Sequence, residues 1–177
     1  MNTHLLVKAA LIAALTAVAA QIMIPLPFSA VPITLQVFFP LLAGAVLGAG
    51  FGALSQVIYV LLGAIGLPVF AGGHSGPGVL IGPTGGYLFG FIASAFVVGI
   101  IVGKGKGTTA RLAIAMISGI IAIYILGVVQ LALVSRMSIP QAIIAGAVPF
   151  ILPDLVKAAF AVVAARRIGL ATDRQDG

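Results

Sequence analysis

Residues 110–134 read ARLAIAMISGIIAIYILGVVQLALV, an apolar run in which Arg111 is the single charged side chain. A helix that rises 1.5 Å per residue over this length spans the hydrocarbon core of a bilayer, which is about 30 Å thick. The run lacks the ten-residue alternation of apolar and polar positions that is typical of an outer-membrane β-barrel. It therefore predicts a transmembrane helix and an all-α membrane fold.

The composition of the whole chain agrees with this prediction. Of its 177 residues, 62% are hydrophobic and 7% are charged, and the mean hydropathy is +1.29. A water-soluble domain of this size could not cover its surface with so few charges. The 23 glycines and 10 prolines fit membrane helices, which pack through small residues and tolerate breaks. We therefore expect an integral membrane protein with a single transmembrane domain over residues 1–177.

Net charge and cysteine content exclude several classes of function. A net charge of +6 would suggest nucleic-acid binding in a soluble protein. In a membrane protein it is better explained by basic cytoplasmic loops beside anionic lipid, so we expect membrane lipid and no nucleic acid as a partner. Because the chain has no cysteine, it has no disulfide, thiolate nucleophile or thiolate metal site.

The hydropathy pattern predicts six transmembrane helices. The first five cover about residues 5–24, 35–50, 51–66, 85–102 and 110–134. The last begins near Gln141, is interrupted at Pro149 and Pro153, and ends at residues 166–167. The first span has the crude pattern of a secretion signal, but its apolar run continues to Ile24, so we expect it to be retained.

The basic residues predict the orientation of these spans. With six spans, both termini and two of the loops share one side of the membrane. That side carries Lys8, Lys104, Lys106, Arg111, Arg166, Arg167 and Arg174, whereas the other side carries Arg136. The positive-inside rule places both termini in the cytoplasm. The segments 25–34, 67–84 and 136–140 are then outside, and the long, glycine-rich 67–84 loop is of a length that usually has a function.

Asp154 and Lys157 are an acid and a base placed in the apolar run 149–160 (PFILPDLVKAAF). A spacing of three residues puts both side chains on one face of a helix, where they can pair or share a polar ligand. Charged residues at membrane depth are costly and usually face a cavity, a partner or a substrate. We interpret the pair as a ligand site near the outer side rather than as a purely structural ion pair.

Catalytic and cofactor motifs fail. The segment 103–109 lacks the G-x4-G-K-[ST] spacing of a phosphate loop. The segment 73–76 (GHSG) matches the serine motif of rhomboid-type proteases, but the second histidine, His4, is at the cytoplasmic end and cannot act as the base. Two isolated histidines do not make a zinc site. We therefore predict a protein that is not an enzyme and has no cofactor.

Two stripes of small residues predict close helix packing. They are Ala9, Ala13 and Ala17 with Ala10 and Ala14 on the adjacent ridge, and Gly44, Gly48 and Gly52. The glycine stripe is interpreted as a contact between the second and third helices. The alanine stripe fits either internal packing or the docking of a partner helix.

Four ordered segments resemble the BioY family, the biotin-binding components of energy-coupling-factor vitamin transporters. They are residues 31–36 (VPITLQ), 59–73 (YVLLGAIGLPVFAGG), 82–90 (GPTGGYLFG) and 149–157 (PFILPDLVK). The resemblance covers about residues 5–169. It implies the six-helix S-component fold, high-affinity biotin binding near the outer face, and uptake across the cytoplasmic membrane.

The resemblance also implies partners and site residues. The partners would be a transmembrane coupling subunit, the T-component, and two ABC-type ATPase subunits. The alanine stripe, Ala9, Ala13, Ala17, Ala10 and Ala14, would contact the coupling subunit. Biotin would contact Asp154, Lys157, Tyr87 and Gln36, with backbone from the 72–86 segment, including Gly73 and Gly86.

The roles within the pair stay open at this point. In one assignment, Asp154 accepts a ureido N–H of biotin and Lys157 donates to the ureido carbonyl. In the other, Lys157 pairs with the carboxylate of biotin. Two further readings are an S-component for another small vitamin, and an ion- or proton-coupled carrier in which Asp154 titrates.

Overall fold

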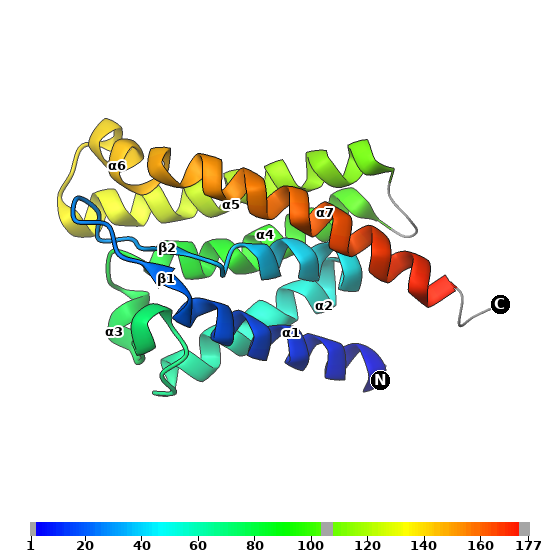
Figure 1. Cartoon of the computed structure of the whole chain (residues 1–177). Coiled ribbons are helices and arrows are strands. Elements are labelled where there is room, and N and C mark those ends of the chain that lie inside the picture. Colours follow the sequence, from blue (N-terminus) through cyan, green and yellow to red (C-terminus); the bar gives the residue numbers. More distant parts are fainter. Residues whose placement is uncertain (1–2, 104–107, 174–177) are drawn as a thin grey trace.

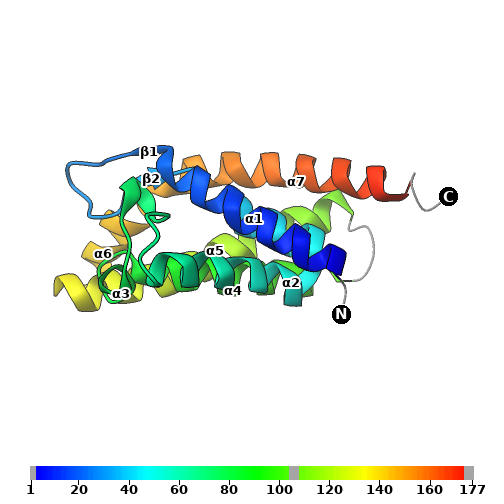
Figure 2. The same cartoon turned by 90° about the horizontal axis from the view of Figure 1, so that it is seen from below.

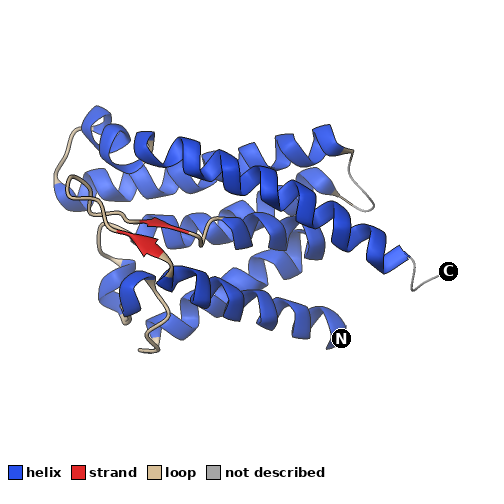
Figure 3. Ribbon diagram, viewed as in Figure 1, coloured by secondary structure: helices blue, strands red, loops and turns tan. Residues whose placement is uncertain are grey.

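The chain forms a bundle of helices, as Figures 1 and 3 show. The computed structural model describes residues 3–103 and 108–173, so the predicted basic positions Lys104, Lys106 and Arg174 lie outside it. Five stretches of the described residues are long and apolar enough to cross a membrane. They are α1 (Thr3–Gln21), α2 (Phe38–Ala64), α4 (Gly85–Val102), α5 (Thr109–Ser135), and a composite of α6 (Ile139–Gly146), η2 (Val148–Phe150) and α7 (Ile151–Asp173).

The α2 stretch reverses direction at Gly48 and so supplies two of the six predicted spans. Gly48 has φ 75° and ψ 178°, a conformation outside the helical region that glycine adopts readily. A Cβ atom at Gly52 would lie 2.9 Å from the Cα of Gly44, although eight residues of straight helix would separate them by about 12 Å. The two arms therefore run antiparallel (Figure 1). The predicted pair of spans at 35–50 and 51–66 is confirmed, with the turn at Gly48.

Glycine allows the α2 arms to pack closely on α4. A Cβ atom at Gly44 would lie 2.8 Å from the Cβ of Val98, and one at Gly99 would collide with the backbone of Ala49. The predicted glycine stripe thus packs both between the two arms and against α4. Gly90 continues the close packing on the other side of α4, where a Cβ atom would lie 2.8 Å from the Cα of Ile123 in α5.

One end of the bundle carries the short elements, and we call it the ribbon end. The strands β1 (Met23–Ile24) and β2 (Ile33–Thr34) pair antiparallel there. The predicted first helix therefore stops at Gln21, and the second begins at Phe38. The 65–84 loop contains η1 (Ala71–Gly73) and α3 (Pro77–Leu80).

Side chains tie the 65–84 loop to the helices. Gln130 of α5 donates from Nε2 to Leu80 O at 2.7 Å and to Gly82 O at 2.8 Å. Gln21, the last residue of α1, donates from Nε2 to Phe70 O at 3.2 Å. The loop is therefore an ordered part of the ribbon end.

The last predicted span needs one correction. The interruption at Pro149 is confirmed, because Pro149 lies in η2 between α6 and α7. The interruption at Pro153 is wrong, since α7 begins at Ile151 and continues through it. Proline is tolerated in the first turn of a helix, where its missing N–H would have no intrahelical acceptor.

The start of α1 and the end of α7 lie at the end of the bundle opposite the ribbon, as two perpendicular views show (Figures 1 and 2). This arrangement agrees with the even number of predicted crossings. The exposed Arg166 and Arg167 lie near the end of α7, and Arg111 lies near the start of α5. Basic side chains therefore gather at the terminal end of the bundle.

Candidate ligand-binding site

A cavity of about 250 Å³ lies at the ribbon end of the bundle. Its volume lies slightly below the usual range for small-molecule sites, about 300–1,000 Å³. The wall combines α4, α5 and α7 with the β1–β2 ribbon and the 65–84 loop. Its polar members are Ser29, Thr34, Gln36, His74, Thr84, Tyr87, Tyr124, Asp154 and Lys157, and the rest are apolar, including Phe70, Phe91 and Phe150.

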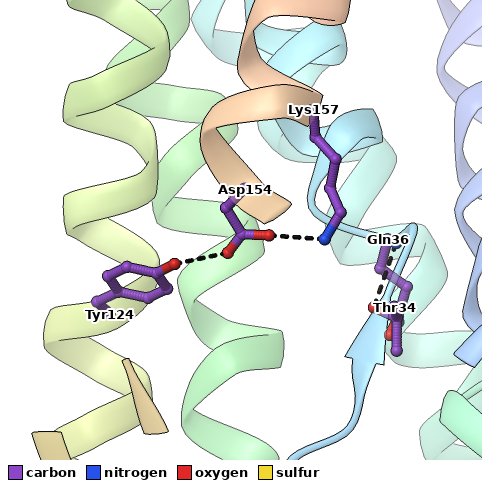
Figure 4. A network of polar contacts seen from close by, with 5 residues as sticks. All are labelled: Thr34, Gln36, Tyr124, Asp154 and Lys157. Atoms are coloured by element: carbon purple, nitrogen blue, oxygen red, sulfur yellow. Dashed lines mark hydrogen bonds and ion pairs between the residues drawn. The ribbon is translucent and has the colours of Figure 1, made fainter. Parts of the chain in front are cut away.

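Asp154 and Lys157 form a buried ion pair on the cavity wall. Lys157 Nζ lies 2.7 Å from Asp154 Oδ1, and Tyr124 Oη donates to Asp154 Oδ2 at 2.7 Å (Figure 4). Asp154 is 2% exposed and Lys157 is 9% exposed. Each carboxylate oxygen therefore has a donor, which offsets part of the cost of burying the charge.

The local fold explains how the pair reaches the cavity. The 3-10 turn η2 breaks the composite helix, and α7 restarts at Ile151. Asp154 then lies in the first turn of α7, where the helix dipole favours a negative charge. Lys157 follows three residues later on the same face, as the sequence spacing predicted.

Tyr87 and Gln36 also line the cavity, and the side chain of each donates a hydrogen bond to a neighbouring group. Tyr87 Oη donates to Gly146 O at 2.7 Å. Gln36 Nε2 donates to Tyr59 Oη at 2.6 Å, and Tyr59 Oη donates to Val69 O at 3.1 Å. The hydroxyl oxygen of Tyr87 and the carbonyl oxygen of Gln36 are thus left as acceptors.

The structure brings four of the six predicted ligand-site residues to one cavity: Asp154, Lys157, Tyr87 and Gln36. Gly73 and Gly86 are not among the residues that line it. Gly86 packs against α5, where a Cβ atom would lie 2.8 Å from the Cβ of Gln130. Gly73 is exposed in η1 with φ 76°. The glycines serve packing and turns, and neighbouring side chains form the wall.

Tyr124 is a polar wall residue that sequence reasoning did not assign to the site. It stands in the apolar run 110–134, and thirty positions separate it from Asp154, its hydrogen-bond partner. No sequence spacing connects residues of two different helices. The one available signal was a lone phenol at membrane depth, which needs a partner when buried.

The alanine stripe of α1 divides between the interior and the surface. Ala9 is 0% exposed and Ala13 is 1% exposed, whereas Ala17 is half-buried. Ala10 and Ala14 are exposed. In this conformation Ala9 and Ala13 pack inside the bundle, so a partner helix could reach only the ridge of Ala10 and Ala14.

Comparison with known proteins finds a matching family and close sequence relatives of this chain. The model of the BioY family matches residues 1–174. The chain is similar to the biotin transporter BioY of Thermotoga maritima, with 48% identity over 92% of this chain and 94% of the relative. It is also similar to the probable biotin transporter BioY of Pyrococcus horikoshii, with 45% identity over 90% of this chain and 92% of the relative.

A solved structure agrees with these relatives. It is the crystal structure of the S-component for biotin from an ECF-type ABC transporter, with a TM-score of 0.85 and 28% identity over 95% of this chain and 93% of that chain. The predicted six-helix S-component fold is confirmed by this match. The curated relatives are named as transporters, not as enzymes. From the family match and the identity to these relatives, the chain belongs to the BioY family.

Proposed function

We propose that this chain binds biotin with high affinity and is the substrate-specific subunit of an energy-coupling-factor transporter in the cytoplasmic membrane. The observation that carries the proposal is the ion pair of Asp154 and Lys157, which is buried and yet lines a cavity in a member of the BioY family. A charge pair at membrane depth is costly, and the binding of a polar ligand is a function that would account for this cost.

The chemistry of biotin complements this pair. Its fused ring carries a ureido group with two N–H donors and one strong carbonyl acceptor. Asp154 would accept one N–H. Lys157 would donate to the carbonyl through an ammonium hydrogen that is not bonded to Asp154. Both charged groups then gain hydrogen bonds in a dry site, where charge-assisted bonds are strong.

The apolar wall suits the rest of the ligand. Phe91 of α4 and Phe150 of η2 offer aromatic surface to the fused rings. Leu26 and Val31, between β1 and β2, line the side of the cavity that the ribbon covers. The ribbon segment would therefore close over the aliphatic chain of biotin.

The basic terminal end supports the orientation of the transporter. By the positive-inside rule, that end faces the cytoplasm and the ribbon end with its cavity faces outward. A T-component and two ATPase subunits would supply energy, because the sequence lacks a phosphate loop. The exposed ridge of Ala10 and Ala14 on α1 is the part of the alanine stripe that could contact the T-component.

The other ligand assignments are less well supported. A carrier that uses Asp154 for proton coupling is not favoured, since the relatives are named as biotin transporters and both carboxylate oxygens already have donors. The swapped assignment, in which Lys157 binds the carboxylate of biotin, predicts a different affinity for biotinamide. Tight binding of biotinamide supports the ureido assignment, and a large loss supports the swap.

The experiment that tests the function is a thermal-shift panel of small vitamins on detergent-solubilised protein. A ligand at 100 times its Kd stabilises the folded state by about 2.7 kcal/mol, so biotin is expected to raise Tm clearly above the other vitamins. Direct biotin binding is then measured for wild type, Asp154→Asn and Lys157→Met. A wild-type protein that biotin does not stabilise would overturn the proposal.

A further inference from the structure

The amide of Gln36 has a fixed orientation. Tyr59 has one hydroxyl hydrogen, and it donates this hydrogen to Val69 O at 3.1 Å. Toward Gln36, which lies 2.6 Å away, the Tyr59 oxygen can therefore act only as an acceptor. With the Tyr59 hydrogen on Val69 O, the NH2 group of Gln36 faces Tyr59, and Oε1 is left as the acceptor end of the amide.

This acceptor belongs to the same wall as the ion pair. Gln36 is 4% exposed and lines the cavity with Asp154 and Lys157. Figure 4 shows Lys157 extending from α7 toward the segment that carries Thr34 and Gln36, while Tyr124 lies on the other side of Asp154. In this view the Lys157 ammonium lies between the Asp154 carboxylate and Gln36. These groups are an acceptor, a donor and an acceptor.

The edge of a cyclic urea has the complementary order. Its carbonyl acceptor stands between two N–H donors. We propose that Gln36 Oε1 accepts the second ureido N–H, on the side of Lys157 away from Asp154, and that Tyr59 is a positioning residue that holds the amide in this orientation. This inference rests on the proposed function, because it assumes that the ureido group faces the ion pair.

A neutral amide suits this position better than a second carboxylate. A carboxylate beside Lys157 would compete with Asp154 for the ammonium and would add a buried negative charge. The amide supplies a directed acceptor without a charge. A site that pairs both N–H groups rejects analogues that lack either one, since a buried acceptor is then left without a partner.

The test compares biotin with its two singly N-methylated regioisomers, each blocked at one ureido nitrogen. In wild type, each methyl group is expected to weaken binding about tenfold or more, because each N–H has its own acceptor. In Gln36→Leu, biotin is expected to bind about 5- to 100-fold more weakly. The penalty for methylation should nearly vanish at one nitrogen and persist at the other.

Tyr59→Phe tests the positioning role. It leaves the amide in place but removes its acceptor, so the penalty at the same nitrogen should fall by a smaller factor than in Gln36→Leu. Ser118→Ala is the matched control, because its hydroxyl bonds to Ile114 O within α5 and does not line the cavity. It should keep the wild-type pattern for all three ligands.

Two results would overturn the inference while leaving biotin binding intact. One is a wild-type protein that binds one of the two N-methylated regioisomers as tightly as biotin, which would show that the N–H at that nitrogen has no acceptor. This measurement needs no variant, so it decides the matter even if Gln36→Leu does not fold. The other is a folded Gln36→Leu protein in which both methylation penalties stay at their wild-type size. Failure of wild type to bind biotin would instead count against the proposed function.

Discussion

The sharpest test of the site is a double-mutant cycle on the buried ion pair. The variants are Asp154→Asn, Lys157→Met and the two combined. With an effective dielectric constant near 20, unit charges 2.7 Å apart attract by about 6 kcal/mol. Most of this attraction is offset by the cost of removing both ions from water, which is several kcal/mol per ion. The net worth of the pair is therefore small, but the cost of leaving one charge alone is large.

Each single variant is expected to destabilise the protein by about 3–5 kcal/mol, because it leaves one buried charge uncompensated. The double variant removes both charges and should recover most of that loss. Lys157→Met leaves Asp154 with its bond from Tyr124, which preserves one partner for the carboxylate. Stability is measured by denaturation of the detergent-solubilised protein without ligand, under identical conditions for all four proteins.

Biotin binding should follow a different pattern from stability. Removing either partner is expected to cost about 2–5 kcal/mol of binding free energy, which corresponds to about 30- to 4,000-fold in Kd. The double variant should bind no better than the worse single variant, since both ureido contacts are gone. Recovery of stability without recovery of binding would separate the structural role of the pair from its role in recognition.

An additive cycle would refute this reasoning. If the double variant lost as much stability as the sum of the two singles, the charges would not be coupled. The pair would then act as two independent polar residues.

Three further predictions concern orientation and packing. Because the chain lacks cysteine, a single cysteine in Ser75→Cys should react with a membrane-impermeant thiol reagent on intact cells, and one in Arg167→Cys only after permeabilisation; the reverse pattern would invert the orientation. Gly99→Ala is expected to lower stability by about 1–3 kcal/mol, since its Cβ atom would collide with the turn of α2. Gly50→Ala, with open space around it, should be neutral or slightly stabilising. Gln56→Met is expected to change Tm little, because it removes a buried Oε1 that has no partner among the described residues together with the hydrogen bonds from Nε2 to Thr16 and Ser55.

The sequence predicted the membrane fold well because bilayer thickness directly limits helix length. It also predicted two spans between residues 35 and 66, although both are short. The position of the turn was harder to predict from the sequence, since Gly44, Gly48 and Gly52 all fit a stripe on a straight helix. Only the positive φ of Gly48 distinguishes a reversal from a packing stripe.

Residue spacing predicted the part of the site whose side chains lie on a single helix. Asp154 and Lys157 are three residues apart, so their common face follows from helix geometry. Tyr124 lies on another helix, and its approach to Asp154 depends on how α5 and α7 are rotated against each other. Gly73 and Gly86 were inferred from the flexibility of glycine, which does not distinguish a wall from a turn or a helix contact.

The hydrogen bonds around Gln36 connect this residue to the 65–84 loop. Tyr59 binds the amide of Gln36 and also the backbone of Val69, which belongs to the 65–84 loop. The same loop is held to α5 by Gln130 and to α1 by Gln21. If the loop moves to admit a ligand, Tyr59 loses its acceptor in the loop, and its hydrogen becomes available to the oxygen of Gln36. The amide would then be free to turn, so the orientation that suits a second ureido N–H is enforced only when the loop is closed. Selectivity for the ureido edge is therefore expected to be a property of the closed state, in which water is excluded and an unpaired acceptor costs most.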